Sequence, residues 1–246
     1  MPRTLSTVAF QALELKGSLL PSSLLEAIAQ LERPKELLLT PADYGLPRGE
    51  RLRDRLDAAW VRVQAIWADY RSQSEQRSAR DASVAMAQRL LTEVLGWPAL
   101  HACNGWQQGE LHYPITHRAF DGAVPLIIEG LEADLLDQGL AQFGQEGRKR
   151  SAHSCLQECL NADDDADWGL LISGSRLRLL HDNLSLVKPA YLSVDLEALI
   201  EGDAFDEFAV VWLLLHASRF RHPQTGSCVL DQWKQAAEAS GERVLG

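Results

Sequence analysis

The spacing of apolar residues changes along the chain, and this change limits the folds that the chain can adopt. In residues 50–71 and again in residues 86–95, apolar side chains recur every three or four positions, which predicts two amphipathic helices. In residues 111–130 and 168–195 the runs are shorter and of β type. Helices followed by strands, a further helix and more strands predict a mixed α/β (α+β) fold, in which a small mixed sheet is flanked by helices.

Shorter signals complete this outline. Residues 8–16 suggest an extended segment, and Ser23 with Glu26 has the pattern of a helix capping box. Ser151 is a candidate N-cap for a helix that reaches Asn161. We therefore expect three parts. These are a strand with a mainly helical segment over residues 1–75, a mixed α/β domain over residues 76–222, and the start of a linker helix over residues 223–246 that leads to a further C-terminal part.

Charge and composition exclude some classes of protein. A net charge of −10 argues against a protein that coats nucleic acid by bulk attraction. Local clusters of basic residues are still compatible with this net charge. The sequence has no apolar run of membrane-spanning length and no signal peptide, so we expect a cytoplasmic protein without membrane contact. Its four cysteines form no C-x-x-C pair, which favours reduced thiols.

Two carboxylates bracket one apolar run in DGAVPLIIEGLEADL. Asp121 precedes this run and Glu129 ends it, and paired carboxylates on a rigid strand are ligands for a divalent cation in metal-assisted hydrolysis. Glu93, on the preceding helix, is a candidate third carboxylate. Leu131 stands where a nuclease of this kind has a lysine, so no charge there stabilises a developing anion. An ordinary buried strand with an acid at each end is the competing interpretation.

Basic residues suggest a contact with phosphates. Arg148, Lys149 and Arg150 directly precede Ser151, where backbone N–H groups at a helix start also favour an anion. Arg176 and Arg178 alternate along a strand, and we expect both to point outward from a hairpin at the sheet edge. A solvated surface is the alternative.

Cysteine and histidine spacing gives a further expectation. His153, Cys155 and Cys159 are spaced so that only the two cysteines share a helix face, which favours buried thiols over a zinc site. Glycine-rich phosphate loops and a GxSxG elbow are absent from the sequence.

Several segments together resemble a known family. KGSLLPSSLLEAIA, TPADYGLPRGERLRDRLDAAWVRVQAIWADYR, LHYPITH and SCLQECLNADDDADWGLLISGSRLRLLHDNLSLVKPAYLSVDLEALIEGDAFDEFAVVWLLLHASRF are similar to the N-terminal region of Eco57I-like, adenine-specific DNA methyltransferases. These include type IIG restriction-modification enzymes and the DISARM methylase. The likeness covers most of the chain and rests on the order of these segments and on their local amino-acid sequences.

The resemblance implies a PD-(D/E)XK nuclease-like fold for this segment. It places Glu93 at the helix acid, Asp121 and Glu129 at the two metal ligands, and Leu131 at the lysine. Gln157 matches the glutamine of a downstream Q-x-x-x-Y motif. The tyrosine of that motif is replaced by Asn161.

In the family, the methyltransferase motif and the S-adenosylmethionine motif lie further along the polypeptide, and neither occurs in this sequence. We therefore expect no cofactor for this segment, with Mg²⁺ only in the case of an active nuclease. The expected partners are double-stranded DNA, held weakly by a local basic patch, and a C-terminal methyltransferase domain or subunits of a defence system.

The leading functional hypothesis is a catalytically inactive DNA-handling or scaffold domain of a restriction-modification methyltransferase. One alternative is an active Mg²⁺-dependent endonuclease with a displaced lysine, for which Lys149 and Lys188 are candidates. Another is a purely structural domain that docks partners and never contacts DNA.

Overall fold

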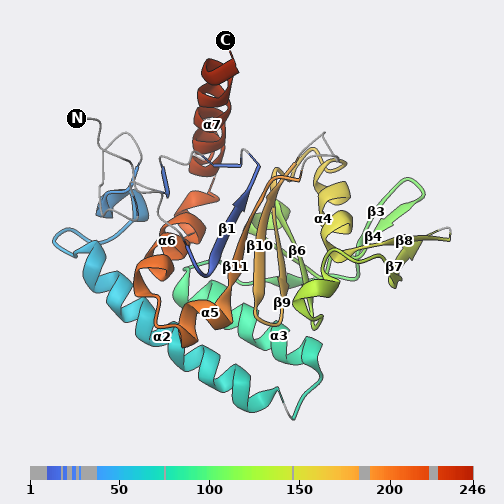
Figure 1. Ribbon diagram of the computed structural model, residues 1–246, viewed down its shortest axis with the longest axis horizontal. Helices are drawn as coiled ribbons and strands as arrows, with labels where there is room; N and C mark the ends of the chain where they lie inside the picture. The colour runs from blue at the N-terminus through green and yellow to red at the C-terminus, as the bar shows by residue number, and fades with distance from the viewer. Residues whose placement is uncertain are drawn as a thin grey trace.

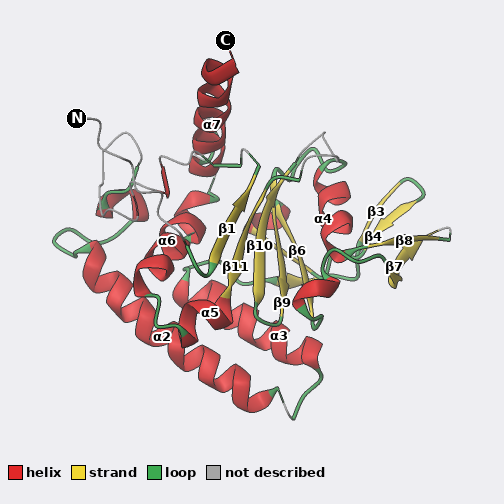
Figure 2. Ribbon diagram, in the orientation of Figure 1, coloured by secondary structure: helices red, strands yellow, loops and turns green. Residues whose placement is uncertain are grey.

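A seven-stranded mixed sheet forms the centre of the protein (Figures 1 and 2). The computed structural model describes residues 10–17, 19–20, 24–25, 28, 38–74, 76–145, 147–182, 189–221 and 227–245. In spatial order the strands are β1 (Leu13–Lys16), β11 (Tyr191–Asp195), β10 (Arg176–His181), β9 (Trp168–Ser173), β6 (Val124–Glu129), β5 (His117–Ala119) and β2 (His101–Ala102). Within this sheet the β6–β9 pair is parallel and the other pairs are antiparallel. The predicted mixed α/β fold class is confirmed.

Helices cover both faces of this sheet (Figure 2). The first face packs against α2 (Leu52–Gln73), α3 (Ala79–Arg89), the π-helical turn η3 (Leu90–Val94), α5 (Leu196–Glu201) and α6 (Phe205–Leu215). The second face packs against α4 (Ala152–Leu160). Short 3₁₀ turns, η2 (Pro41–Tyr44), η4 (Phe120–Gly122), η5 (Ala133–Leu135) and η6 (Ala217–Arg219), join these elements. The helices expected over residues 50–71 and 86–95 are thus present, the second beginning earlier than predicted.

Alternation along the strands divides the core into two layers. In β6, Leu126 and Ile128 lie in the layer under α2, α3 and α6, whereas Ile127 faces α4. All six residues of β9 are buried, as expected for a strand covered on both faces. The β9–β10 hairpin is therefore central in the sheet. The prediction that it forms the sheet edge is wrong.

The connection from β6 to β9 carries α4 across the second face. Ser151 caps this helix, since its Oγ accepts a hydrogen bond from the Ser154 N–H at 3.0 Å, which confirms the predicted N-cap. Gly169 lets α4 approach β9 closely, because a Cβ there would lie 3.0 Å from the Leu156 side chain and 3.1 Å from the Pro125 carbonyl oxygen.

Two small hairpins lie beside each other away from the main sheet (Figure 1). One is formed by β3 (Trp106–Gln108) and β4 (Leu111–Tyr113), and the other by β7 (Leu140–Gln145) and β8 (Arg148–Arg150). The basic run that the sequence placed before a helix is thus itself a strand.

Elements near both ends of the chain pack against the central part of the protein. Strand β1 falls within the predicted extended segment, and the predicted capping pair, Ser23 and Glu26, lies outside the described residues. Helix α2 shares one core with α3 and the sheet, so a common core spans residue 75. Helix α7 (Val229–Leu245) is tied to β9 where the Trp168 Nε1–H donates to Asp231 at 2.7 Å. Across the described residues, no helix combines the length and apolarity that crossing a membrane requires.

Candidate functional site

Glu129 ends β6 inside a cavity of about 500 Å³. The segment before β5 contributes Pro114, Ile115 and Thr116 to its lining, and the small hairpins contribute His112 and Gln142. Arg80, from the first turn of α3, completes the polar lining. The cavity thus combines one carboxylate and one guanidinium with other polar groups.

Helix α3 can lie close to Glu129 because the next residue in the chain, Gly130, has no side chain. A Cβ on Gly130 would lie 2.4 Å from the Arg80 backbone nitrogen, so only glycine allows this approach. The Arg80 Nε then lies 3.8 Å from the Glu129 Oε2, and the Glu129 side chain is 12% exposed. Burial raises the pKa of the Glu129 carboxyl group, and the charge of Arg80 opposes this shift.

Sequence reasoning missed Arg80. A cation in the first turn of a helix is disfavoured by the helix dipole, so the run Ser78-Ala79-Arg80 contained a signal that this arginine has a partner elsewhere.

Asp121 lies at the opposite end of β6 from Glu129. Strand β6 runs over six residues from Val124 to Glu129, or roughly 17 Å at about 3.3 Å per residue, and Asp121 precedes its start. Asp121 lines a different cavity. The expectation that Asp121 and Glu129 share a metal ion is therefore wrong, because a strand of this length holds its two ends apart.

The other two residues implied by the resemblance also lie elsewhere. Glu93 forms ion pairs with Arg62 and Arg89 on the outer side of η3. Gln157 is 6% exposed, and its Nε2 donates to the His181 carbonyl at 2.8 Å, which ties α4 to the end of β10. Neither side chain lines the Glu129 cavity.

The lysine position is occupied by a residue whose backbone is held in place. The Leu131 N–H donates to the Ser173 Oγ at 2.6 Å, and that hydroxyl donates back to the Leu131 carbonyl at 2.9 Å. Among the described residues, no lysine lines the Glu129 cavity. Lys149 lies on β8, packed beside Gly139, and Lys188 is outside the described residues. Within the described part of the chain, no group of three His, Cys, Asp or Glu side chains could hold a metal ion.

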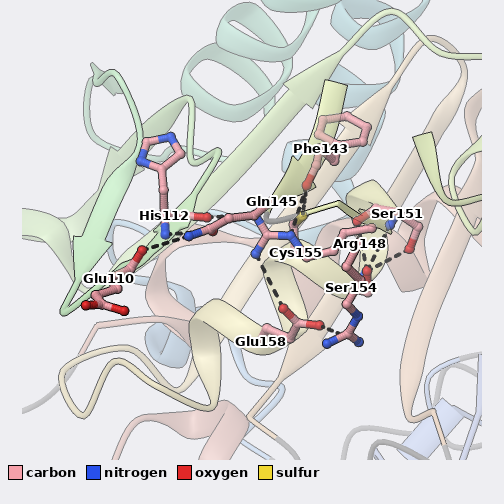
Figure 3. Close-up of polar contacts among 10 residues, drawn as sticks. Glu110, His112, Phe143, Gln145, Arg148, Ser151, Ser154, Cys155 and Glu158 are labelled. Atoms are coloured by element: carbon pink, nitrogen blue, oxygen red, sulfur yellow. Dashed lines mark hydrogen bonds and ion pairs between the residues drawn. The ribbon is translucent and has the colours of Figure 1, made fainter. Parts of the chain in front are cut away.

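The predicted basic patch on β8 is only partly available to a ligand. Figure 3 shows the polar contacts around this strand, including those of Arg148 and Glu158. Arg150 is buried, and it donates to the Phe143 carbonyl at 2.9 Å and to the His112 carbonyl at 2.7 Å. Its Nη1 also lies 3.4 Å from Glu158. Arg148 is 74% exposed, with Glu158 at 3.5 Å, and Lys149 is exposed. Arg150 therefore joins two hairpins, and its assignment to a DNA surface is wrong.

Arg176 and Arg178 do not point freely outward. Arg178 is 8% exposed and forms a two-pronged ion pair with Asp137, at 2.7 and 2.9 Å. Arg176 pairs with Asp195 at 2.8 Å. Both guanidinium groups already have carboxylate partners, so the prediction that they contact DNA phosphates is not supported by their positions.

The cysteines of α4 are buried thiols, as expected. Cys155 and Cys159 are fully buried, and burial raises their pKa values to about 11 and about 12. Burial lowers the pKa of His153 to about 4, so its imidazole is neutral at pH 7.

The chemistry open to the Glu129 cavity follows from this inventory. A single carboxylate provides too few anionic ligands for Mg²⁺, and the guanidinium beside it repels a cation. The same two groups can hold a polar ligand through hydrogen bonds. This chain matches no protein-family model, no curated protein and no solved structure.

Proposed function

We propose that this chain is a nuclease-like domain without hydrolytic activity that handles DNA within a larger adenine-specific restriction-modification methyltransferase of the cytoplasm. The observation that supports it most is the order of elements. Helix α3 precedes the antiparallel strands β2, β5 and β6, and α4 then leads to β9, parallel to β6. This arrangement is a mixed sheet flanked by helices, which agrees with the nuclease-like fold that the family resemblance implies.

The loss of activity follows from the Glu129 cavity. The resemblance requires a second carboxylate and a lysine close to Glu129, but Asp121 lines a different cavity and Leu131 occupies the lysine position. Here Pro114, Ile115 and Thr116 line the cavity instead, and Arg80 lies beside the single carboxylate. Metal-activated attack on a phosphodiester therefore lacks a second carboxylate ligand, and the Arg80 charge opposes the binding of a metal ion beside Glu129.

Incubation of supercoiled plasmid with the protein and Mg²⁺ or Mn²⁺ tests this part of the proposal. We expect no nicking above a buffer control. Nicking by the wild type that Glu129→Ala or Asp121→Ala abolishes would show an active nuclease with a displaced lysine.

DNA contact requires a separate measurement. Of the five predicted cations, Arg148 and Lys149 remain the most exposed, and both lie on the β7–β8 hairpin. Each neutralised phosphate contributes roughly −0.9 to the slope of log K against log salt. The double variant Arg148→Ala/Lys149→Ala should therefore weaken binding to a fluorescent duplex and flatten this slope by up to about two units.

A matched control keeps the net charge change equal. Arg48→Ala/Arg77→Ala also removes two exposed cations, but far from β8 in the sequence. It should leave the slope unchanged. If the wild type binds no duplex even at low salt, DNA handling is contradicted and partner docking becomes the better hypothesis.

A further inference from the structure

A second cavity, of about 530 Å³, lies at the Asp121 end of β6. Three chain segments that are distant in sequence meet around it. They are the β5–β6 turn with Phe120 and Asp121, the segment before β2 with His101, and the end of η6 with Phe220 and Arg221. Its size falls within the range of about 300–1,000 Å³ that is usual for small-molecule sites.

Fixed aromatic rings form one wall of this cavity. Phe120 and Phe220 stack with centroids 5.7 Å apart and an interplanar angle of 19°. Trp97 packs edge-on against both, at 4.8 and 4.6 Å, and its Nε1–H donates to the Leu215 carbonyl at 2.8 Å. Phe220 is 2% exposed whereas Phe120 is half-buried, so Phe120 is the more accessible of the stacked rings.

The turn that carries Phe120 has an unusual backbone. Phe120 and Asp121 have φ angles of 51° and 57°, in the left-handed region that bulky residues rarely adopt. The Arg118 Nη1–H donates to the Gly122 carbonyl at 2.7 Å, and Arg118 is itself paired with Asp163 at 2.8 Å. Strained turns held in this way by their surroundings are concentrated at ligand sites.

Three ionisable side chains at the cavity rim lack partners. Among the described residues, the side chains of Asp121, His101 and Arg221 form no hydrogen bond or ion pair, and each residue is exposed. A carboxylate, an imidazole and a guanidinium thus surround an aromatic wall. The three groups complement a ligand that has a planar ring, a hydrogen-bond donor on that ring and an anionic group.

We propose that this cavity binds a nucleotide whose base carries an exocyclic amino group. The base stacks on Phe120, the amino group donates to the Asp121 carboxylate, and the phosphate accepts from Arg221 and His101. A free nucleoside monophosphate and a nucleotide within single-stranded DNA share this chemistry. The site is independent of the Glu129 cavity and of the β8 cations.

Titration with AMP, followed by calorimetry and amide NMR shifts, tests the proposal. Binding should shift amides of residues 99–101 and 119–123. Purine riboside monophosphate, which lacks the amino group, should bind about tenfold or more weakly, since it makes no charged hydrogen bond to Asp121. A single-stranded oligonucleotide with one adenine, compared with free AMP, identifies which source is held more tightly.

Two substitutions of Asp121 separate binding from folding. Asp121→Asn keeps a residue that tolerates the left-handed region and should weaken AMP binding about tenfold or more without lowering Tm. Asp121→Gly also permits a φ of 57°, so AMP binding should fall while the protein remains folded. Asp134→Asn, an exposed carboxylate on η5, is the control and should change neither.

Other results would overturn the proposal. They are an absence of AMP binding at millimolar concentration, equal affinity for AMP and purine riboside monophosphate, and unchanged affinity in Asp121→Asn. DNA binding through β8 is measured with different variants, so its outcome does not affect this test.

Discussion

Replacing Arg150 with alanine should disconnect the two small hairpins. The side chain is 6% exposed and reaches two carbonyl oxygens and one carboxylate. A second link runs through Gln145, whose Oε1 accepts from the His112 N–H at 3.0 Å and whose Nε2 donates to the Glu110 carbonyl at 2.7 Å. The Gln145 amide pairs with the β3–β4 hairpin as a strand backbone would, but its two hydrogen bonds are exposed, so Arg150 is the buried connection.

The expected magnitude follows from these contacts. Removing one partner of a buried ionic group typically destabilises a protein by about 3–5 kcal/mol, since the remaining groups are left unsatisfied. The Phe143 carbonyl would retain only a weak contact from the Cys155 Sγ at 3.9 Å. For a chain of this size, 1 kcal/mol corresponds to about 2–4 °C in Tm. Arg150→Ala should therefore lower Tm by on the order of 10 °C.

Urea unfolding and amide hydrogen exchange check this expectation. Exchange should accelerate first in residues 106–113 and 140–150, before the main sheet opens. Arg150→Lys should lose most of the same stability, because one ammonium group cannot replace the planar fork. The matched control is Arg148→Ala, on the same strand and 74% exposed, which should change stability by less than about 0.5 kcal/mol. Equal effects of Arg150→Ala and Arg148→Ala would refute the reasoning.

Three further predictions concern titration and reactivity. Burial lowers the pKa of His216 from 6.5 to about 4. The stabilising contribution of the neutral imidazole should therefore be complete above pH 6.5 and should be lost as the pH falls toward 4, by up to about 3 kcal/mol. Urea unfolding of the wild type and of His216→Gln at pH 7 and 4.5 measures this loss. Burial raises the pKa of Glu129, so its carboxyl group should destabilise the fold increasingly as the pH rises through the ordinary glutamate value, and Glu129→Gln should remove that dependence in the same assay. Three cysteines are buried, and burial raises their pKa values to about 11 or 12: Cys155, Cys159 and Cys228. With a thiol reagent at pH 8, Cys103 should therefore react first and these three thiols only on unfolding. Mass spectrometry of the labelled protein measures the order of reaction.

Local features of the fold were predictable from the sequence. The spacing over residues 50–71 identified α2, because helical periodicity over six turns leaves little ambiguity. Ser151 was a correct N-cap because capping depends on residues within one turn. Strand β6 was recognised with Glu129 at its end, although its partners were not.

Long-range features were not predictable in the same way. Whether Arg150 and Arg178 point to solvent depends on the His112 carbonyl and Asp137, which are distant in the sequence and identified only by the fold. The central position of β9 had a usable signal, because the run WGLLIS has no polar alternation and such strands are covered on both faces. The cavity that Asp121 lines also depends on Arg221, and spacing along the chain cannot show that these residues meet.

The pairing of β1 with β11 has a consequence for synthesis on the ribosome. Leu13 lies opposite Val194, so the first strand of the sheet meets its neighbour only after roughly 180 further residues have been made. At about 5–20 residues per second, that interval is on the order of ten to forty seconds. During this time the nascent strand has no edge to join, while β9 and β10 pair as soon as both have emerged. Completion of the sheet is therefore a late event, and an emerging chain exposes the β11 side of β10 to chaperones and to other chains until it occurs.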